Sequence, residues 1–155
     1  MITLDFDIKA LIQGVEKIAA YEGGRSKDDA SAYLRIAITE EDHPKLRLHL
    51  PEICSLLEMA LADFKTVAAP DASVICVQIH TTNRWQSLHQ DAVRKGIEAY
   101  FLNLLAAKWF SVVAPEFAVK YEGMANSELT GLPRLLHRKA PPIRRYDSGD
   151  CMTVK

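Results

Sequence analysis

The sequence has few cysteines, and they form no recognisable pattern. Cys54, Cys76 and Cys151 are odd in number and widely spaced, and no two of them make a Cys-x-x-Cys pair. We therefore expect neither a disulfide framework nor a zinc site, and a reducing cytoplasm is the compartment that fits best. Cys54 and Cys76 have apolar neighbours, where burial raises the pKa of a thiol, so a cysteine nucleophile is not expected.

An excess of charge of one sign and a long apolar run are also missing. The 155 residues carry a formal charge of -1, and 48% are hydrophobic, which is typical of a globular domain rather than a generally nucleic-acid-binding one. Asn103 and Lys108 interrupt the longest apolar stretch, and residues 1–7 hold acids where a signal peptide holds cations. We expect no membrane contact and no export, and any basic surface must be local.

No segment carries a catalytic motif, a metal-ligand cluster or a phosphate-binding loop. His80 and His89 approach each other in the expected layout, but nothing else converges on them, so two surface histidines are the simpler interpretation. The acids at residues 40–42 suit the start of a helix, and Gly23-Gly24 follows a helix rather than a strand. We expect no catalytic residue, metal or cofactor, although an active site built from scattered residues would leave no local motif.

Helical periodicity is the main positive signal in the first part of the chain. Apolar residues between Ile8 and Ala19 recur at i, i+3, i+4 spacing, which predicts an amphipathic helix. Asp5 or Asp7 is placed to cap it, and Gly23-Gly24 is placed to end it. The following residues 33–38 fit a short helix or a short strand equally well.

A second helical region begins near Thr39. The acids at residues 40–42 suit the positive end of a helix, and Pro51 removes a backbone donor further along, so we expect a kink or two pieces. The second piece places its apolar residues on one side, namely Ile53, Leu56, Leu57, Ala60, Leu61 and Phe64.

Residues 74–80 form the one clear strand signal. This run is rich in β-branched residues and follows a predicted turn at residues 68–71. A single strand leaves its backbone groups unpaired, so it needs a partner. The candidates are residues 1–4, residues 33–38 or a strand from another copy, and the last option is a reason to expect oligomers.

The second half of the chain is dominated by one long helix. It begins at a possible capping box at residues 87–90 and ends near Val113, and residues 97–113 have the spacing of a core helix. Pro115 ends this helix and can start another over residues 116–124. A last apolar patch follows, made of Leu129, Leu132, Leu135 and Leu136.

Together these signals predict a mainly α protein. We expect a bundle of four to five helices with one short strand or β-hairpin, in a single domain over residues 1–137. Residues 138–155 contain two adjacent prolines and few apolar anchors, which predicts an extended basic tail.

Two groups of residues are candidates for binding a partner. Arg84 and Trp85 lie in a predicted turn, and a tryptophan beside an arginine suits a recognition surface, although such a ring packs on its own domain about as often. The second group is basic and lies at the start of the tail, where it can grip phosphates or an acidic protein groove. Its members are Arg134, Arg138, Lys139, Arg144 and Arg145.

The order of elements resembles that of phage head–tail connector and neck proteins. The resemblance uses the helix at residues 53–64, the strand at residues 74–80, the long helix at residues 92–113 and the C-terminal extension. It implies a non-enzymatic subunit that assembles into a homo-oligomer and contacts other assembly proteins, in the cytoplasm or in a virion. The alternative is a small helical regulator that binds nucleic acid through its basic C-terminal segment.

Overall fold

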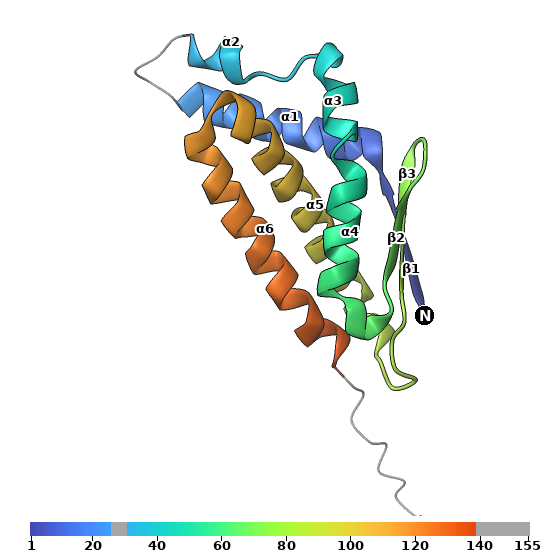
Figure 1. Ribbon diagram of the computed structural model, residues 1–155. Coiled ribbons are helices and arrows are strands. Elements are labelled where there is room, and N and C mark those ends of the chain that lie inside the picture. The colour runs from blue at the N-terminus through green and yellow to red at the C-terminus, as the bar shows by residue number, and fades with distance from the viewer. Residues whose placement is uncertain (26–30, 139–155) are drawn as a thin grey trace, which may run out of the picture.

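The protein packs its helices against one face of a small antiparallel sheet. The computed structural model describes residues 1–25 and 31–138, and Figure 1 shows how their elements are arranged. Helices account for most of these residues, so the predicted mainly α bundle with a small β element is confirmed. Of the predicted tail, only Arg138 lies within the described residues.

The chain opens with strand β1 (Ile2–Asp7), which leads directly into helix α1 (Ile8–Arg25). The carboxylate of Asp7 accepts a hydrogen bond from the backbone N–H of Lys9 at 2.8 Å, so the prediction that names Asp7 as the cap is confirmed. The predicted stop at Gly23-Gly24 is wrong, because α1 continues to Arg25. Glu22, in its last turn, is buried against helix α6 (Pro115–Leu136), and this tertiary contact outweighs the low helix propensity of glycine.

The sheet has the order β1-β3-β2, with β3 (Val74–Ile79) in the centre. β1 pairs with β3 from Ile2 opposite Ile79 to Asp7 opposite Val74, so the N-terminal strand is the partner that the sequence required. The predicted turn at residues 68–71 is wrong in part, because strand β2 (Val67–Pro70) pairs with the other side of β3. Pro70 is tolerated there because an edge strand does not need all of its backbone donors.

Side chains cover both outer edges of this sheet. On the β1 edge, the guanidinium of Arg94 donates to the carbonyl oxygen of Asp5 at 2.9 Å. On the β2 edge, the backbone N–H of Ala68 donates to the carboxylate of Glu58 at 2.7 Å. Since these edge groups are occupied, they are not available to a strand from another copy.

The middle of the chain forms helix α2 (Ala32–Ile36), a 3₁₀ turn η1 (Glu40–Asp42), helix α3 (His43–Arg47) and helix α4 (Leu50–Ala60). The sequence left residues 33–38 open between a short helix and a short strand, and the structure shows a short helix that ends at Ile36. The break between α3 and α4, just before Pro51, confirms that this proline divides the region into two pieces. The apolar side of the second piece is partly wrong, because Leu56 and Ala60 are exposed.

The start of this region is fixed by a side-chain contact. The backbone N–H and the hydroxyl of Thr39 donate to the Asp42 carboxylate at 3.1 and 2.8 Å. Hydrogen bonds from Lys45 and Thr39 lower the pKa of Asp42 to about 2. The predicted helix start at Thr39 is therefore confirmed.

The long helix α5 (Gln90–Val113) and helix α6 (Pro115–Leu136) form an antiparallel hairpin. The predicted capping box at residues 87–90 is wrong: residues 87–89 form a 3₁₀ turn η3 (Ser87–His89), and no side chain caps it. α6 is one helix, whereas the sequence predicted a shorter helix and a separate apolar patch. Pro133 has no backbone N–H to donate. It lies near the end of α6, so only the last turns of the helix lose a hydrogen bond.

Helix α5 is the centre of the core. The ring of Phe101 meets Phe6 of the sheet with centroids 5.5 Å apart, and the hydroxyl of Tyr100 donates to the carbonyl oxygen of Ile53 in α4 at 3.1 Å. Near its other end, the indole N–H of Trp109 donates to the carbonyl oxygen of Ile36 in α2 at 2.9 Å. α5 therefore holds the sheet and the shorter helices in one core.

A buried carboxylate joins α1 to α6. Glu22 accepts hydrogen bonds from the hydroxyl of Tyr121, at 2.7 Å, and from the ammonium group of Lys120. Burial alone would raise the pKa of Glu22, but the hydrogen bonds and the charges of Lys120 and Arg25 outweigh it and lower this pKa. Burial and the neighbouring carboxylate together raise the pKa of Tyr121.

We predict that Glu22→Gln lowers the free energy of unfolding at neutral pH by about 1.5–3 kcal/mol, because a charge-assisted pair is lost. The pKa of Glu22 is below its ordinary value of 4.5, so its contribution is present above that pH and is lost as the pH falls further. Urea unfolding over a pH series tests this, with the exposed Glu98→Gln as control. Equal stability of the wild type and Glu22→Gln at neutral pH would contradict the prediction.

Candidate interaction surface

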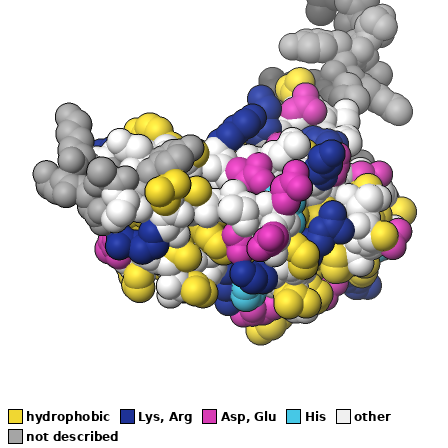
Figure 2. Space-filling view, turned by 90° about the horizontal axis from the view of Figure 1, so that it is seen from above, with side chains coloured by type: hydrophobic (Ala, Val, Ile, Leu, Met, Phe, Trp, Pro, Cys, Tyr) yellow, Lys and Arg dark blue, Asp and Glu magenta, His cyan; other side chains and the backbone are white. Residues whose placement is uncertain are grey.

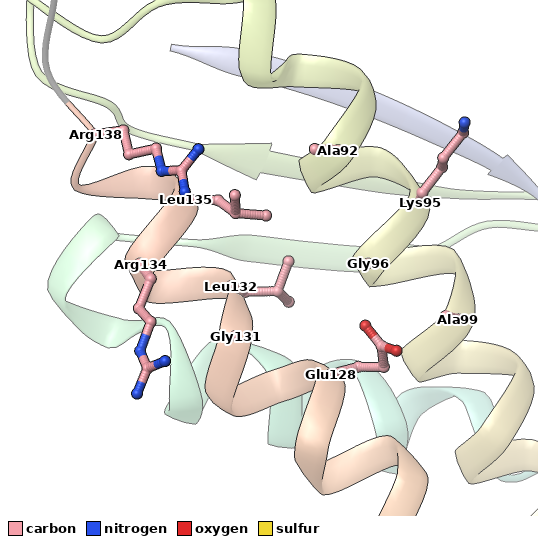
Figure 3. A pocket seen from close by; sticks show the side chains of 10 residues that line it. All are labelled: Ala92, Lys95, Gly96, Ala99, Glu128, Gly131, Leu132, Arg134, Leu135 and Arg138. Atoms are coloured by element: carbon pink, nitrogen blue, oxygen red, sulfur yellow. The ribbon is translucent and has the colours of Figure 1, made fainter.

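An open groove lies between α5 and α6, at the end of the hairpin where α5 begins and α6 ends (Figure 3). Its volume is about 560 Å³. α5 supplies Ala92, Lys95, Gly96 and Ala99, and the other side is formed by Glu128, Gly131, Leu132, Arg134, Leu135 and Arg138.

Small side chains on α5 create this groove. Ala92, Gly96 and Ala99 are spaced i, i+4, i+7 and therefore share one face of the helix. A Cβ atom placed on Gly96 would lie 2.9 Å from a methyl carbon of Leu132, so glycine is what allows the two helices to approach here. Across the groove, a Cβ atom on Gly131 would meet nothing within 4 Å. The hollow is thus open to solvent beside a tight helix–helix contact.

The floor of the groove is apolar and its rims are mostly basic. Leu132 is buried, and Leu135 is half-buried beside it. Figure 3 shows Lys95 on the α5 side and Arg134 on the α6 side, with their side chains pointing away from each other, while Glu128 turns toward α5. Within residues 1–25 and 31–138, Lys95, Arg134 and Arg138 take part in no ion pair. Three cations and one acid leave the groove positive.

The apolar surface extends beyond the groove at the N-terminal end of α5. Leu88 is 82% exposed, and it lies four residues before Ala92. Elsewhere the surface is mixed: Figure 2, a view onto the end of the molecule near α2, shows acidic, basic and apolar side chains interspersed. The groove gathers three cations beside an apolar floor.

The structure places the predicted binding residues unevenly. Arg134 and Arg138 both line the groove, whereas Arg84 is exposed on the loop that precedes α5. The indole of Trp85 is half-buried, and its N–H donates to the carbonyl oxygen of Leu135 at 3.2 Å, so its polar edge is used within its own fold. The other three predicted residues, Lys139, Arg144 and Arg145, lie outside the described residues.

Sequence reasoning missed the α5 side of the groove. The apolar periodicity of α5 points to its core face, and Lys95 and Glu128 each look like an ordinary surface charge. The signal that could have found the groove is the spacing of Ala92, Gly96 and Ala99, which marks a face too small to fill the space beside another helix.

Metal-binding side chains form no cluster in the part of the chain that the structure describes. Among the described residues, no three His, Cys, Asp or Glu side chains are placed to hold a metal ion. Burial, with the charge of Glu58, raises the pKa of Cys54 to about 11, and burial also raises the pKa of Cys76, as the sequence predicted. None of the described helices is both long enough and apolar enough to span a membrane.

Comparison with known proteins gives no match to a protein-family model, to a curated protein or to a solved structure. The geometry of the groove is therefore what indicates a function.

We predict that Trp85→Phe lowers the free energy of unfolding by about 0.5–1.5 kcal/mol, because the ring remains but the hydrogen bond to Leu135 is lost. Urea unfolding measures the effect. The exposed neighbour Arg84→Ala is the control and should change stability by less than about 0.5 kcal/mol. An unchanged stability of Trp85→Phe would show that this bond does not hold the loop to α6.

Proposed function

We propose that this protein is a non-enzymatic interaction subunit whose α5–α6 groove binds an acidic segment of a partner protein. The observation that carries the proposal is the combination of an apolar floor with cations on both rims that form no ion pair within the described residues. Charged groups without partners attract a segment of opposite charge, and an exposed apolar floor provides the contact area that holds it.

Two features of the groove favour a protein segment over nucleic acid. Leu132, Leu135 and the exposed Leu88 offer apolar contacts, which phosphate groups do not use. None of the described residues that line the groove is aromatic, as base stacking requires. An amphipathic helix with leucines on one side and acids beside them suits this surface better.

An assembly role is part of the same proposal. Subunits that form closed or stacked assemblies need surfaces that recognise a neighbour, and a phage head–tail connector or neck protein is one kind of subunit that works in this way. The protein would then act in the cytoplasm or in a virion, through contacts with copies of itself and with other assembly proteins.

Nucleic-acid binding is the second candidate function. It is favoured by one observation: Arg134 and Arg138 at the groove are followed in the sequence by Lys139, Arg144 and Arg145. Binding of this kind is dominated by phosphate contacts, so its affinity falls steeply with salt concentration.

We predict that a fluorescein-labelled helical peptide, with leucines at i, i+3, i+4 spacing and flanking glutamates, binds the full chain. Arg134→Glu/Arg138→Glu should weaken this binding by roughly tenfold or more, because both changes place negative charge beside an acidic ligand. Fluorescence anisotropy measures the affinity.

The matched control is Lys9→Glu/Lys17→Glu, which changes the net charge equally at exposed sites on α1. Its affinity for the peptide should stay within about twofold of wild type, since general charge effects are modest in physiological salt. Equal weakening by both double variants would contradict a groove site. A labelled DNA duplex that binds tightly while the peptide does not would favour the second candidate.

A further inference from the structure

The exposed face of α4 has the features that the groove requires of a partner. Glu52, Leu56 and Met59 are spaced i, i+4, i+7 along α4, and Asp63 follows in the 3₁₀ turn η2 (Ala62–Phe64). Leu56 and Met59 are 40% and 74% exposed. The Glu52 carboxylate accepts a hydrogen bond from Lys108 at 2.7 Å, yet its side chain remains 53% exposed. Two apolar side chains are thus flanked by two acids.

The lengths of the two surfaces agree. From Glu52 to Met59, α4 advances seven residues, or about 10.5 Å along a helix. From Ala92 to Ala99, which line the α5 side of the groove, α5 also advances seven residues. The α4 face can therefore lie along the whole groove, with apolar side chains on the floor and acids near the cationic rims.

These two surfaces lie on different sides of the α5–α6 hairpin. The groove is lined by residues of α5 and α6 and by Arg138, two residues after the end of α6, and α4 contributes none. Seen through the groove in Figure 3, α4 lies behind the two helices. The surfaces cannot meet within one copy, so a contact between them joins two copies through two different patches. Such a contact is heterologous and repeats from copy to copy.

We infer that the α4 face of one copy, formed by Glu52, Leu56, Met59 and Asp63, docks into the α5–α6 groove of a second copy. This inference rests on the proposed function and names the partner as the chain itself. Charge favours this occupant over the chain's own basic segment at residues 139–155, because Lys139, Arg144 and Arg145 would be repelled by the groove's cations. Strand addition is a poor alternative, because Arg94 and Glu58 occupy groups on both sheet edges.

Two single substitutions test the contact on the full chain. Gly131→Gln fills the groove, where a Cβ atom meets nothing of its own fold, and Met59→Lys puts a cation on the α4 face. Light scattering over a wide concentration range should show oligomers for the wild type and monomers for each variant. Gly123→Gln is the matched control, because Gly123 is equally open on the same helix but does not line the groove, and it should assemble like the wild type.

Mixing the two variants gives the decisive result. Gly131→Gln keeps an intact α4 face, and Met59→Lys keeps an intact groove, so one productive contact remains between them. The mixture should form a 1:1 pair and nothing larger. A mixture that stays monomeric, or that grows into the wild-type oligomer, would overturn the inference, as would an oligomer that neither single variant disrupts.

The proposed function fails separately from this inference. If the wild-type chain is monomeric at every concentration, the inference that a second copy binds the groove is wrong. If the acidic peptide still binds, and Gly131→Gln abolishes that binding while Gly123→Gln does not, the groove remains a site for another acidic protein segment. If the peptide does not bind either, the proposed function falls as well.

Discussion

Burial of helix α5 is the constraint on which the rest of this fold depends. Its aromatic residues contact the sheet through Phe101, α4 through Tyr100 and α2 through Trp109. A helix in contact with elements on several sides must be apolar around much of its circumference, and α5 is. The shorter helices and the sheet bury their apolar faces mainly by packing around it, so loss of α5 would leave each of them without a core.

The groove arises from the same packing. Where α5 meets α6 near their ends, Gly96 lets a leucine of α6 come close, and the neighbouring alanines are too short to cover the space beside it. The tight contact and the open hollow are therefore two results of one small-residue face. Within the part of the chain that the structure describes, the cations on its rims form no ion pair, whereas Lys108 and Lys120 bind Glu52 and Glu22.

Periodicity in the sequence predicted the helices well, because burial of α1 and α5 follows their apolar spacing and that of α4 follows it in part. It was less accurate where local propensity competes with tertiary contacts. Residues 68–71 were predicted to form a turn, and pairing with β3 is what makes Val67–Pro70 a strand. Glycines 23 and 24 looked like a helix end, but the buried Glu22 holds the last turn in place. The sequence predicted Arg134 and Arg138 as binding residues, and both line the groove. Lys95 and Glu128 could not be predicted in the same way, because they become neighbours only when α5 packs against α6.

The pairing of β1 with β3 places the first residues of the chain beside residues 74–79. During synthesis, β1 therefore leaves the ribosome long before its neighbour in the sheet exists. Its apolar residues Ile2, Leu4 and Phe6 wait about seventy residues for β3 to pair with their strand, and longer for α5, whose Phe101 packs on Phe6. Contacts between such distant residues form late and slow the folding of a chain. The packing of α5 on the closed sheet is then the event that sets when this domain becomes protected from aggregation.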